Sequence, residues 1–128
     1  MKNIYTDASA DSNNAVIGFT CYDNHVVTSE KTRVLKKITV NQAEMMSVLF
    51  ALTEYPREPL TIHSDSEYVV KTLNGEYKIK KHKELWEITK KLFEQSKSHI
   101  THVKGHAKNE RNNRIDKLVR TTLRNTRK

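Results

Sequence analysis

The chain has 128 residues, of which 36% are hydrophobic and 30% are charged. This length and balance are typical of one soluble globular domain with one core, and they exclude a disordered chain. No apolar run approaches the roughly 20 residues that span a bilayer, and the N-terminus lacks the apolar stretch of a secretory signal. We therefore expect a single domain over residues 1–128, located in the cytoplasm and without membrane contact.

The single cysteine, Cys21, excludes an intrachain disulfide and a cysteine zinc cluster, and is typical of a buried thiol in a reducing compartment. The formal net charge is +8, and residues 104–128 carry nine lysines and arginines against two acidic residues. Such a basic segment favours a polyanion such as nucleic acid as partner. A solvated helix face with a basic tail would have the same composition.

Three strands are predicted at the N-terminal end, over residues 2–7, 15–22 and 25–34, because these stretches are rich in Val, Ile, Thr and aromatic residues. Asp23-Asn24 lies between the second and third stretches and is typical of a hairpin turn. The second and third strands should therefore be antiparallel neighbours.

A helix is predicted next, because the apolar pattern changes to a helical period in residues 40–55. Its apolar stripe is formed by Met45, Val48, Leu49 and Leu52. The later patterns predict, in order, a strand, two helices, a strand and a last helix, over residues 60–64, 66–74, 83–96, 98–103 and from about 112. Helices between the later strands indicate parallel crossovers. The expected fold class is α/β, with a five-stranded mixed sheet of three antiparallel and two parallel strands, flanked by helices.

Four acidic residues fall at the ends of predicted elements. Asp7 ends the first strand and Asp65 follows the fourth, while Glu44 and Asp116 lie in the first turns of two helices. Each position also has a structural interpretation. Asp7 would belong to a turn, and Asp65 would be a helix N-cap. Glu44 would form a capping box with Asn41, and Asp116 would interact with the helix dipole.

Taken together, the four acids indicate a metal site, because ligand sites in open α/β sheets form outside the carboxyl ends of the strands. Clustered carboxylates repel one another and have raised pKa values unless cations neutralise them. Mg²⁺ takes oxygen ligands of this kind together with substrate phosphates. Two metal ions about 3.5–4 Å apart can hold both the attacking and the leaving oxygen of a phosphodiester.

Four segments of the chain are familiar as a set. The stretches "IYTDAS", "VNQAEMMSVLFAL", "HSDSEYVV" and "VKGHAKNERNNRIDKLV" follow one another in this order. They resemble the four motifs of type 1 ribonuclease H, the hybrid-cleaving nuclease that is also fused to retroviral reverse transcriptases. The similarity covers nearly the whole chain, and the predicted order of elements matches the ribonuclease-H-like fold.

The resemblance implies roles for five residues. Asp7 matches the aspartate that bridges two metal ions. Glu44 and Asp65 match the pair that holds the second ion, with Glu44 also near the RNA 2′-hydroxyl. Asp116 matches the fourth acid, on the side of the nucleophile. His106 matches a histidine on a loop that assists proton transfer or product release, although from its local sequence alone it would be a surface histidine.

The implied reaction is endonucleolytic hydrolysis of the RNA strand of an RNA–DNA hybrid by two Mg²⁺ ions, which Mn²⁺ can replace. The products carry a 5′-phosphate and a 3′-hydroxyl. The minor groove of the hybrid displays the 2′-hydroxyls that distinguish RNA from DNA. The family default is a monomer. Polar contacts to the two strands are expected at Asn13, with Asn14 as an alternative, and at Thr39 and Asn41.

The chain departs from the family in a segment that binds substrate. Housekeeping members carry a protrusion rich in Trp and Lys after the third acid, and this chain has only "NGEYKIKKHKELW". This segment either forms a smaller basic patch with Tyr77 as a stacking residue or is a solvated loop. The lysines of the patch would be Lys78, Lys80, Lys81 and Lys83. We expect weaker hybrid affinity than in longer forms, with a steep salt dependence. Trp86 has apolar neighbours at helical spacing and is expected in the core.

Two single positions also differ from the family. Ala8 stands where a glycine is frequent, which affects the shape of the first loop more than the chemistry. Glu67 stands where a glutamine commonly faces the nucleic acid. Its negative charge would weaken binding unless the side chain points to solvent.

Other functions remain open at this point. The chain would be a nucleic-acid-binding module if the short basic segment and Glu67 left it unable to cut. It would be a junction resolvase or an exonuclease if it belonged to another branch of the superfamily, but the ending "VKGHA…NNRID" favours the hybrid nuclease. A phosphatase with an aspartate nucleophile is not expected, because Ser9 stands where its second aspartate would be.

Overall fold

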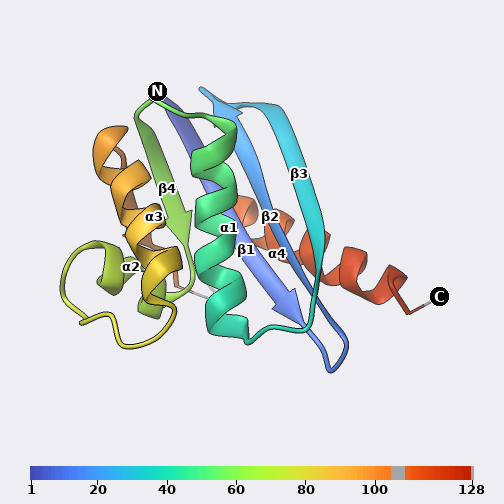
Figure 1. The fold of residues 1–128 in the computed structure, drawn as a ribbon. Helices are drawn as coiled ribbons and strands as arrows, with labels where there is room; N and C mark the ends of the chain where they lie inside the picture. Colours follow the sequence, from blue (N-terminus) through green and yellow to red (C-terminus); the bar gives the residue numbers. More distant parts are fainter. Residues whose placement is uncertain (105–108, 128) are drawn as a thin grey trace.

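The computed structural model of the chain describes residues 1–104 and 109–127. Within them, strands and helices follow one another as Figure 1 shows. They are β1 (Lys2–Ala10), β2 (Asn14–Asp23), β3 (Val26–Lys36), α1 (Val40–Glu54), β4 (Leu60–Ser64), α2 (Glu67–Leu73), α3 (Lys83–Gln95), β5 (His99–His102) and α4 (Glu110–Asn125). Every predicted element is present. None of the described helices is long and apolar enough to cross a membrane.

The five strands form one mixed sheet in the order β3-β2-β1-β4-β5. β2 pairs antiparallel with both β1 and β3, whereas β4 pairs parallel with β1 and with β5. The predicted fold class is therefore confirmed. The β2–β3 hairpin turns at Asn24 and His25, one residue later than expected, and Asn24 adopts a left-handed conformation with φ 59°. Asparagine tolerates this region better than most residues.

The two faces of the sheet are covered differently (Figure 1). α1, α2 and α3 pack on one face, over a core that includes Phe19, Ile62 and the fully buried Trp86. The prediction that Trp86 belongs to the core is confirmed. α4 packs alone on the other face, where Val119 and Leu123 contact a smaller cluster of β1 and β2 side chains.

β1 is longer than predicted. It continues from Asp7 to Ala10, because its antiparallel partner β2 pairs with it up to Ala10↔Ala15. Its parallel pairing with β4 ends earlier, at Thr6↔Ser64. Asp7 therefore lies inside a strand, at the point where one of its two neighbouring strands stops. The alternative that Asp7 belongs to a turn is wrong.

The helices begin at side-chain caps that the sequence patterns did not identify. Thr39 caps α1 by accepting a hydrogen bond from the N–H of Gln42 at 3.2 Å. Ser66 caps α2 in the same way, and Asn109 caps α4. These caps fix where each helix starts. They therefore also fix where Glu44 on α1 and Asp116 on α4 point.

Candidate active site

Three carboxylates converge at one edge of the sheet. Carboxylate oxygens of Asp7, Glu44 and Asp65 all lie within 4.8 Å of one another. Asp7 and Asp65 come together because β1 and β4 are parallel neighbours, so the ends of their pairing meet at the same edge. Glu44 approaches from the second turn of α1, which packs on β1. The arrangement joins residues that are far apart in the sequence.

The helix caps decide between the two interpretations of Glu44 and Asp65. Thr39 is the N-cap of α1, so Glu44 lies beyond the first turn and forms no capping box with Asn41. Ser66, and not Asp65, is the N-cap of α2. Both structural alternatives are therefore wrong, and neither carboxylate serves to begin a helix.

Burial raises the pKa values of two of these carboxylates. Asp7 and Glu44 are only 4% and 6% exposed, while Asp65 is partly exposed. Burial first, and then the negative charge of Asp65, raise the pKa of Asp7 to about 8. Burial and the charges of Asp7 and Asp65 likewise raise the pKa of Glu44 well above its usual range. Without a cation, the cluster therefore tends to hold protons at neutral pH.

Two oxygens of the cluster have no hydrogen-bond partner in the part of the chain that the structure describes. They are Oδ2 of Asp7 and Oε1 of Glu44, and both are buried. The other oxygen of Asp7, Oδ1, accepts a hydrogen bond from the N–H of Ala8 at 2.8 Å. Unpaired buried acceptors are costly and rare. Because all the available donors are carboxylate oxygens, the site fits a hard divalent cation.

Asp116 lies beside this cluster and is not part of its close contacts. α4 begins at Glu110, two residues earlier than predicted, so Asp116 is in the second turn and not in the first. The interpretation that it serves the helix dipole is therefore wrong. Its side chain forms an ion pair with Arg120 at 2.9 Å. Its negative charge is close enough to contribute to the raised pKa of Asp7.

Comparison with known proteins decides the family. A family model described as RNase H matches residues 1–124. The chain belongs to the ribonuclease H family. It is similar to the ribonuclease H of Clostridium botulinum, with 31% identity over 94% of this chain and 93% of the relative. It is also similar to that of Acetivibrio thermocellus, with 33% identity over 91% and 90%. The prediction of a ribonuclease H enzyme is therefore confirmed, and the other enzyme classes are set aside.

Solved ribonuclease H structures share the fold. LC11-RNase H1, isolated from compost, superposes with a TM-score of 0.85 at 24% identity, over 99% of this chain and 98% of that one. A crystal structure of LC11-RNase H1 in complex with an RNA/DNA hybrid gives a TM-score of 0.81 at 23% identity, over 96% and 99%. RNase H1 of Halobacterium salinarum gives 0.83 at 22% identity, over 97% and 98%.

A hollow of about 770 Å³ in this ribonuclease H brings predicted contact residues together. Thr39 and Asn41, at the start of α1, face the segment between α2 and α3 across it. That segment supplies the three lysines Lys78, Lys80 and Lys81, which also line the hollow. Sequence reasoning missed Tyr68 and His82 in the same lining. His82 follows Lys81 directly in the chain, whereas Tyr68 lies in α2, ten residues before Lys78, and had no local signal because its distance to α1 depends on the tertiary fold.

The remaining sequence-predicted positions lie elsewhere. Asn13 is exposed in the turn between β1 and β2, whereas the side chain of Asn14 donates a hydrogen bond to Thr126, which makes Asn13 the freer of the two. Glu67 is exposed and forms an ion pair with Lys71, which lowers its pKa. His106 lies outside the described residues.

Proposed function

We propose that this ribonuclease H hydrolyses the RNA strand of RNA–DNA hybrids and leaves a 5′-phosphate and a 3′-hydroxyl. The observation that carries the proposal is the cluster of Asp7, Glu44 and Asp65, whose carboxylate oxygens lie within 4.8 Å of one another. Two of the cluster's oxygens are buried without a partner among the described residues. A site of this kind costs stability unless a cation fills it, which supports a role in catalysis.

The cofactor we propose is Mg²⁺, as two ions, with Mn²⁺ as a substitute. Asp7, Glu44 and Asp65 would hold one ion, and Asp7 and Asp116 would hold the other. Bound divalent ions neutralise the carboxylates and stabilise the charge that develops on the scissile phosphate. The chain's own contribution is a fixed set of oxygens at the ends of two parallel strands, so that little rearrangement is needed when the ions bind.

The protein groups around the cluster have separate proposed roles. His106 would assist proton transfer or product release. Glu44 would lie near the RNA 2′-hydroxyl, which would help to select the RNA strand. Asn13 would contact the hybrid from the β1–β2 turn. The hollow beside α1 would bind the backbone through Thr39, Asn41, Lys78, Lys80 and Lys81. Contacts of this kind reach phosphate and sugar, so we expect little sequence preference.

We further propose that the chain acts as a monomer, as a single catalytic domain over residues 1–128, in the cytoplasm. The match of the family model to residues 1–124 supports the single domain. The cytoplasmic location rests on the sequence arguments, including the buried free thiol of Cys21.

The test is cleavage of a labelled RNA–DNA hybrid, with an RNA duplex and a DNA duplex as controls, in Mg²⁺ and in Mn²⁺. Asp65→Asn should abolish cutting, because it removes one ligand charge at almost constant size. Asp23→Asn makes the same change in an exposed residue at the end of β2 and should leave cutting intact. A wild-type protein that binds the hybrid but cuts in neither metal would instead support the binding-module alternative.

A further inference from the structure

A second hollow, of about 240 Å³, lies between the end of β1 and the C-terminal turns of α4. We call it the arginine hollow. Its lining is strongly basic: Ser9, Ala10, Leu123, Arg120, Arg124 and Arg127. The three arginines are spaced by four and three residues, so they follow one stripe along α4. This hollow is separate from the one that Thr39 and the lysines line.

The three arginines of the hollow keep N–H donors that can bind an anion. Arg120 forms an ion pair with Asp116 at 2.9 Å, and Arg127 forms one with Asp11 at 3.1 Å. Arg124 has no acidic partner within the described residues. The Arg120 and Arg127 side chains are 57% and 61% exposed, and ion pairs at the surface contribute little to stability. Because each guanidinium has five N–H donors, all three side chains keep donors for a further anion.

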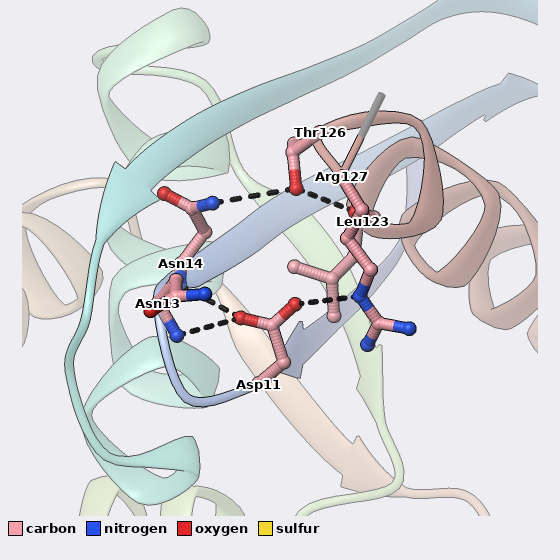
Figure 2. A network of polar contacts seen from close by, with 6 residues as sticks. All are labelled: Asp11, Asn13, Asn14, Leu123, Thr126 and Arg127. Atoms are coloured by element: carbon pink, nitrogen blue, oxygen red, sulfur yellow. Dashed lines mark hydrogen bonds and ion pairs between the residues drawn. The ribbon is translucent and has the colours of Figure 1, made fainter.

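One rim of the hollow is held in place by the network in Figure 2. The Oδ1 atom of Asp11 accepts hydrogen bonds from the backbone N–H groups of Asn13 and Asn14, both at 2.8 Å. Its Oδ2 atom accepts from Nε of Arg127. The side chain of Asn14 donates to Oγ1 of Thr126 at 3.3 Å. The C-terminal turn is thereby tied to the β1–β2 turn, and Arg127 is positioned before any ligand arrives.

The arginine hollow lies next to the acidic cluster. Ser9 follows Asp7 by two residues in β1, so the two side chains are on the same face of the strand and about 7 Å apart along it. Arg120 joins the two places, because it pairs with Asp116 and also lines the hollow. A nucleic-acid strand advances about 3.4 Å per nucleotide along its duplex axis. The distance along β1 therefore corresponds to one or two nucleotides.

We propose that the arginine hollow binds a backbone phosphate of the RNA strand, one or two nucleotides from the phosphate that is cut. Guanidinium groups bind phosphates with paired hydrogen bonds, and the Ser9 hydroxyl adds a donor from the strand that carries Asp7. The RNA strand is the partner because Ser9 and Arg120 both adjoin the acids at which that strand would be hydrolysed. The inference rests on the proposed function, since it assumes that the RNA strand reaches these acids.

The test measures hybrid binding in EDTA over a range of salt concentrations, so that no cutting occurs. Each lost phosphate contact reduces the slope of log K against log salt by about 0.7–0.9. Arg124→Gln should reduce the slope by about this amount and weaken binding at low salt. Lys91→Gln removes one charge from an exposed position on α3, on the other face of the sheet, and should leave the slope unchanged. Arg124→Lys should keep most of the slope.

A second arm identifies the strand. Hybrids carry a single uncharged methylphosphonate, placed at successive positions of either the RNA strand or the DNA strand. In the wild type, binding should fall when the substitution is one or two nucleotides from the cleavage position in the RNA strand, and Arg124→Gln should be insensitive to it. Sensitivity confined to the DNA strand would overturn the proposal, and so would an Arg124→Gln slope equal to that of Lys91→Gln.

The two proposals fail separately. Cleavage of the unmodified hybrid by wild type in Mg²⁺ tests the function alone, and its absence would reject the function whatever the slopes. Intact cleavage with unchanged slopes in Arg124→Gln would reject only the arginine hollow. Thermal unfolding of Arg124→Gln should match that of the wild type, because Arg124 is exposed and has no ion pair in the described part of the chain.

Discussion

The residues with the largest energetic consequence are the two buried carboxylates, Asp7 and Glu44. Each has one oxygen without a hydrogen-bond partner among the described residues, and each lies beside another acid. In a protein selected for stability alone, apolar or amide side chains would be better at these positions. The arrangement is favourable only when a cation is present, so these residues couple the stability of the fold to the ligand of the site.

The stability of the metal-free protein should fall as pH rises. The pKa of Asp7 is about 8 in the folded protein against 3.8 in the unfolded chain, so the folded state holds the proton more tightly. The stabilisation is complete below about pH 4 and is lost as pH rises through about 8. At about 1.36 kcal/mol per pKa unit, this difference of about four between the two pKa values corresponds to a loss of roughly 5–6 kcal/mol across the window. Urea unfolding in EDTA at several pH values measures it.

Asp7→Asn provides the comparison for this pH dependence, because the amide does not titrate. The difference in unfolding free energy between wild type and Asp7→Asn should change with pH between 4 and 8, in favour of the variant at the alkaline end. Asp23→Asn, at an exposed position, should follow the wild type. Parallel curves for wild type and Asp7→Asn would contradict the raised pKa.

Mg²⁺ should reverse this loss. Binding to the folded state alone stabilises a protein by about 2.7 kcal/mol when the free ligand is at 100 times its Kd. We therefore expect added Mg²⁺ to raise the melting temperature of the wild type at pH 8 and to give a calorimetric binding signal. Both effects should disappear in Asp7→Asn and persist in Asp23→Asn. A binding signal that is the same in wild type and Asp7→Asn would exclude Asp7 as a ligand.

At the scale of elements, the position of α4 depends on one point, at Gly18, where the helix comes very close to the sheet. Gly18 in β2 lies opposite Asp7 in the strand pairing and beneath α4. A Cβ atom at this position would lie 3.0 Å from Cγ1 of Val119 and 3.0 Å from the carbonyl oxygen of Lys31. The absence of a side chain therefore lets α4 approach the sheet, and α4 carries both Asp116 and the arginine stripe.

Gly18→Ala should therefore displace α4 and destabilise the protein by about 1–3 kcal/mol, the usual cost of overpacking. Chemical denaturation measures the change. Gly18→Ala combined with Val119→Ala should recover only part of the loss, because the carbonyl of Lys31 remains in the way. Gly18→Ala with wild-type stability would mean that α4 can shift without cost.

Sequence patterns predicted the elements better than their ends. The hydrophobic stripe of α1 and the β-branched runs of β1 and β2 identify these elements from neighbouring residues alone. The caps at Thr39 and Ser66 were missed, because the acids near them fit capping patterns equally well. One hydrogen bond decides between two such patterns, and local sequence does not show which bond forms.

At the scale of the whole molecule, the sequence predicted the topology but not the distances between side chains on different elements. The spaced motifs placed Asp7, Glu44 and Asp65 at one edge of the sheet, as the structure has them, because the strands and the start of α1 were predicted at the right places, although β1 runs three residues further than expected. The separation of Asp116 from the close cluster, and the contact between Asp11 and Arg127, depend on how α4 lies across the sheet. Such contacts join residues more than a hundred positions apart, and no periodic pattern encodes them.

Removal of residues 124–128 tests the contribution of the whole basic C-terminus. We expect hybrid binding to weaken strongly at low salt and little at high salt, because three positive charges are lost. A gel-shift titration at two salt concentrations measures this. The variant with Lys90, Lys91 and Lys97 all changed to Gln loses the same charge from other surfaces and should bind more tightly than the truncated chain. Equal weakening in both would mean that net charge alone matters.

The central place of β1 has a consequence for how the chain folds. β1, β2 and β3 are consecutive hairpin-linked strands and can associate as soon as residues 2–36 are available. β4 joins β1 only after a loop of some fifty residues closes, and such long-range pairing forms slowly. We therefore expect Asp7 and Asp65 to stay apart until this late step. The repulsion between Asp7 and Asp65 is therefore expected to oppose only this late pairing, and the early hairpins form without it.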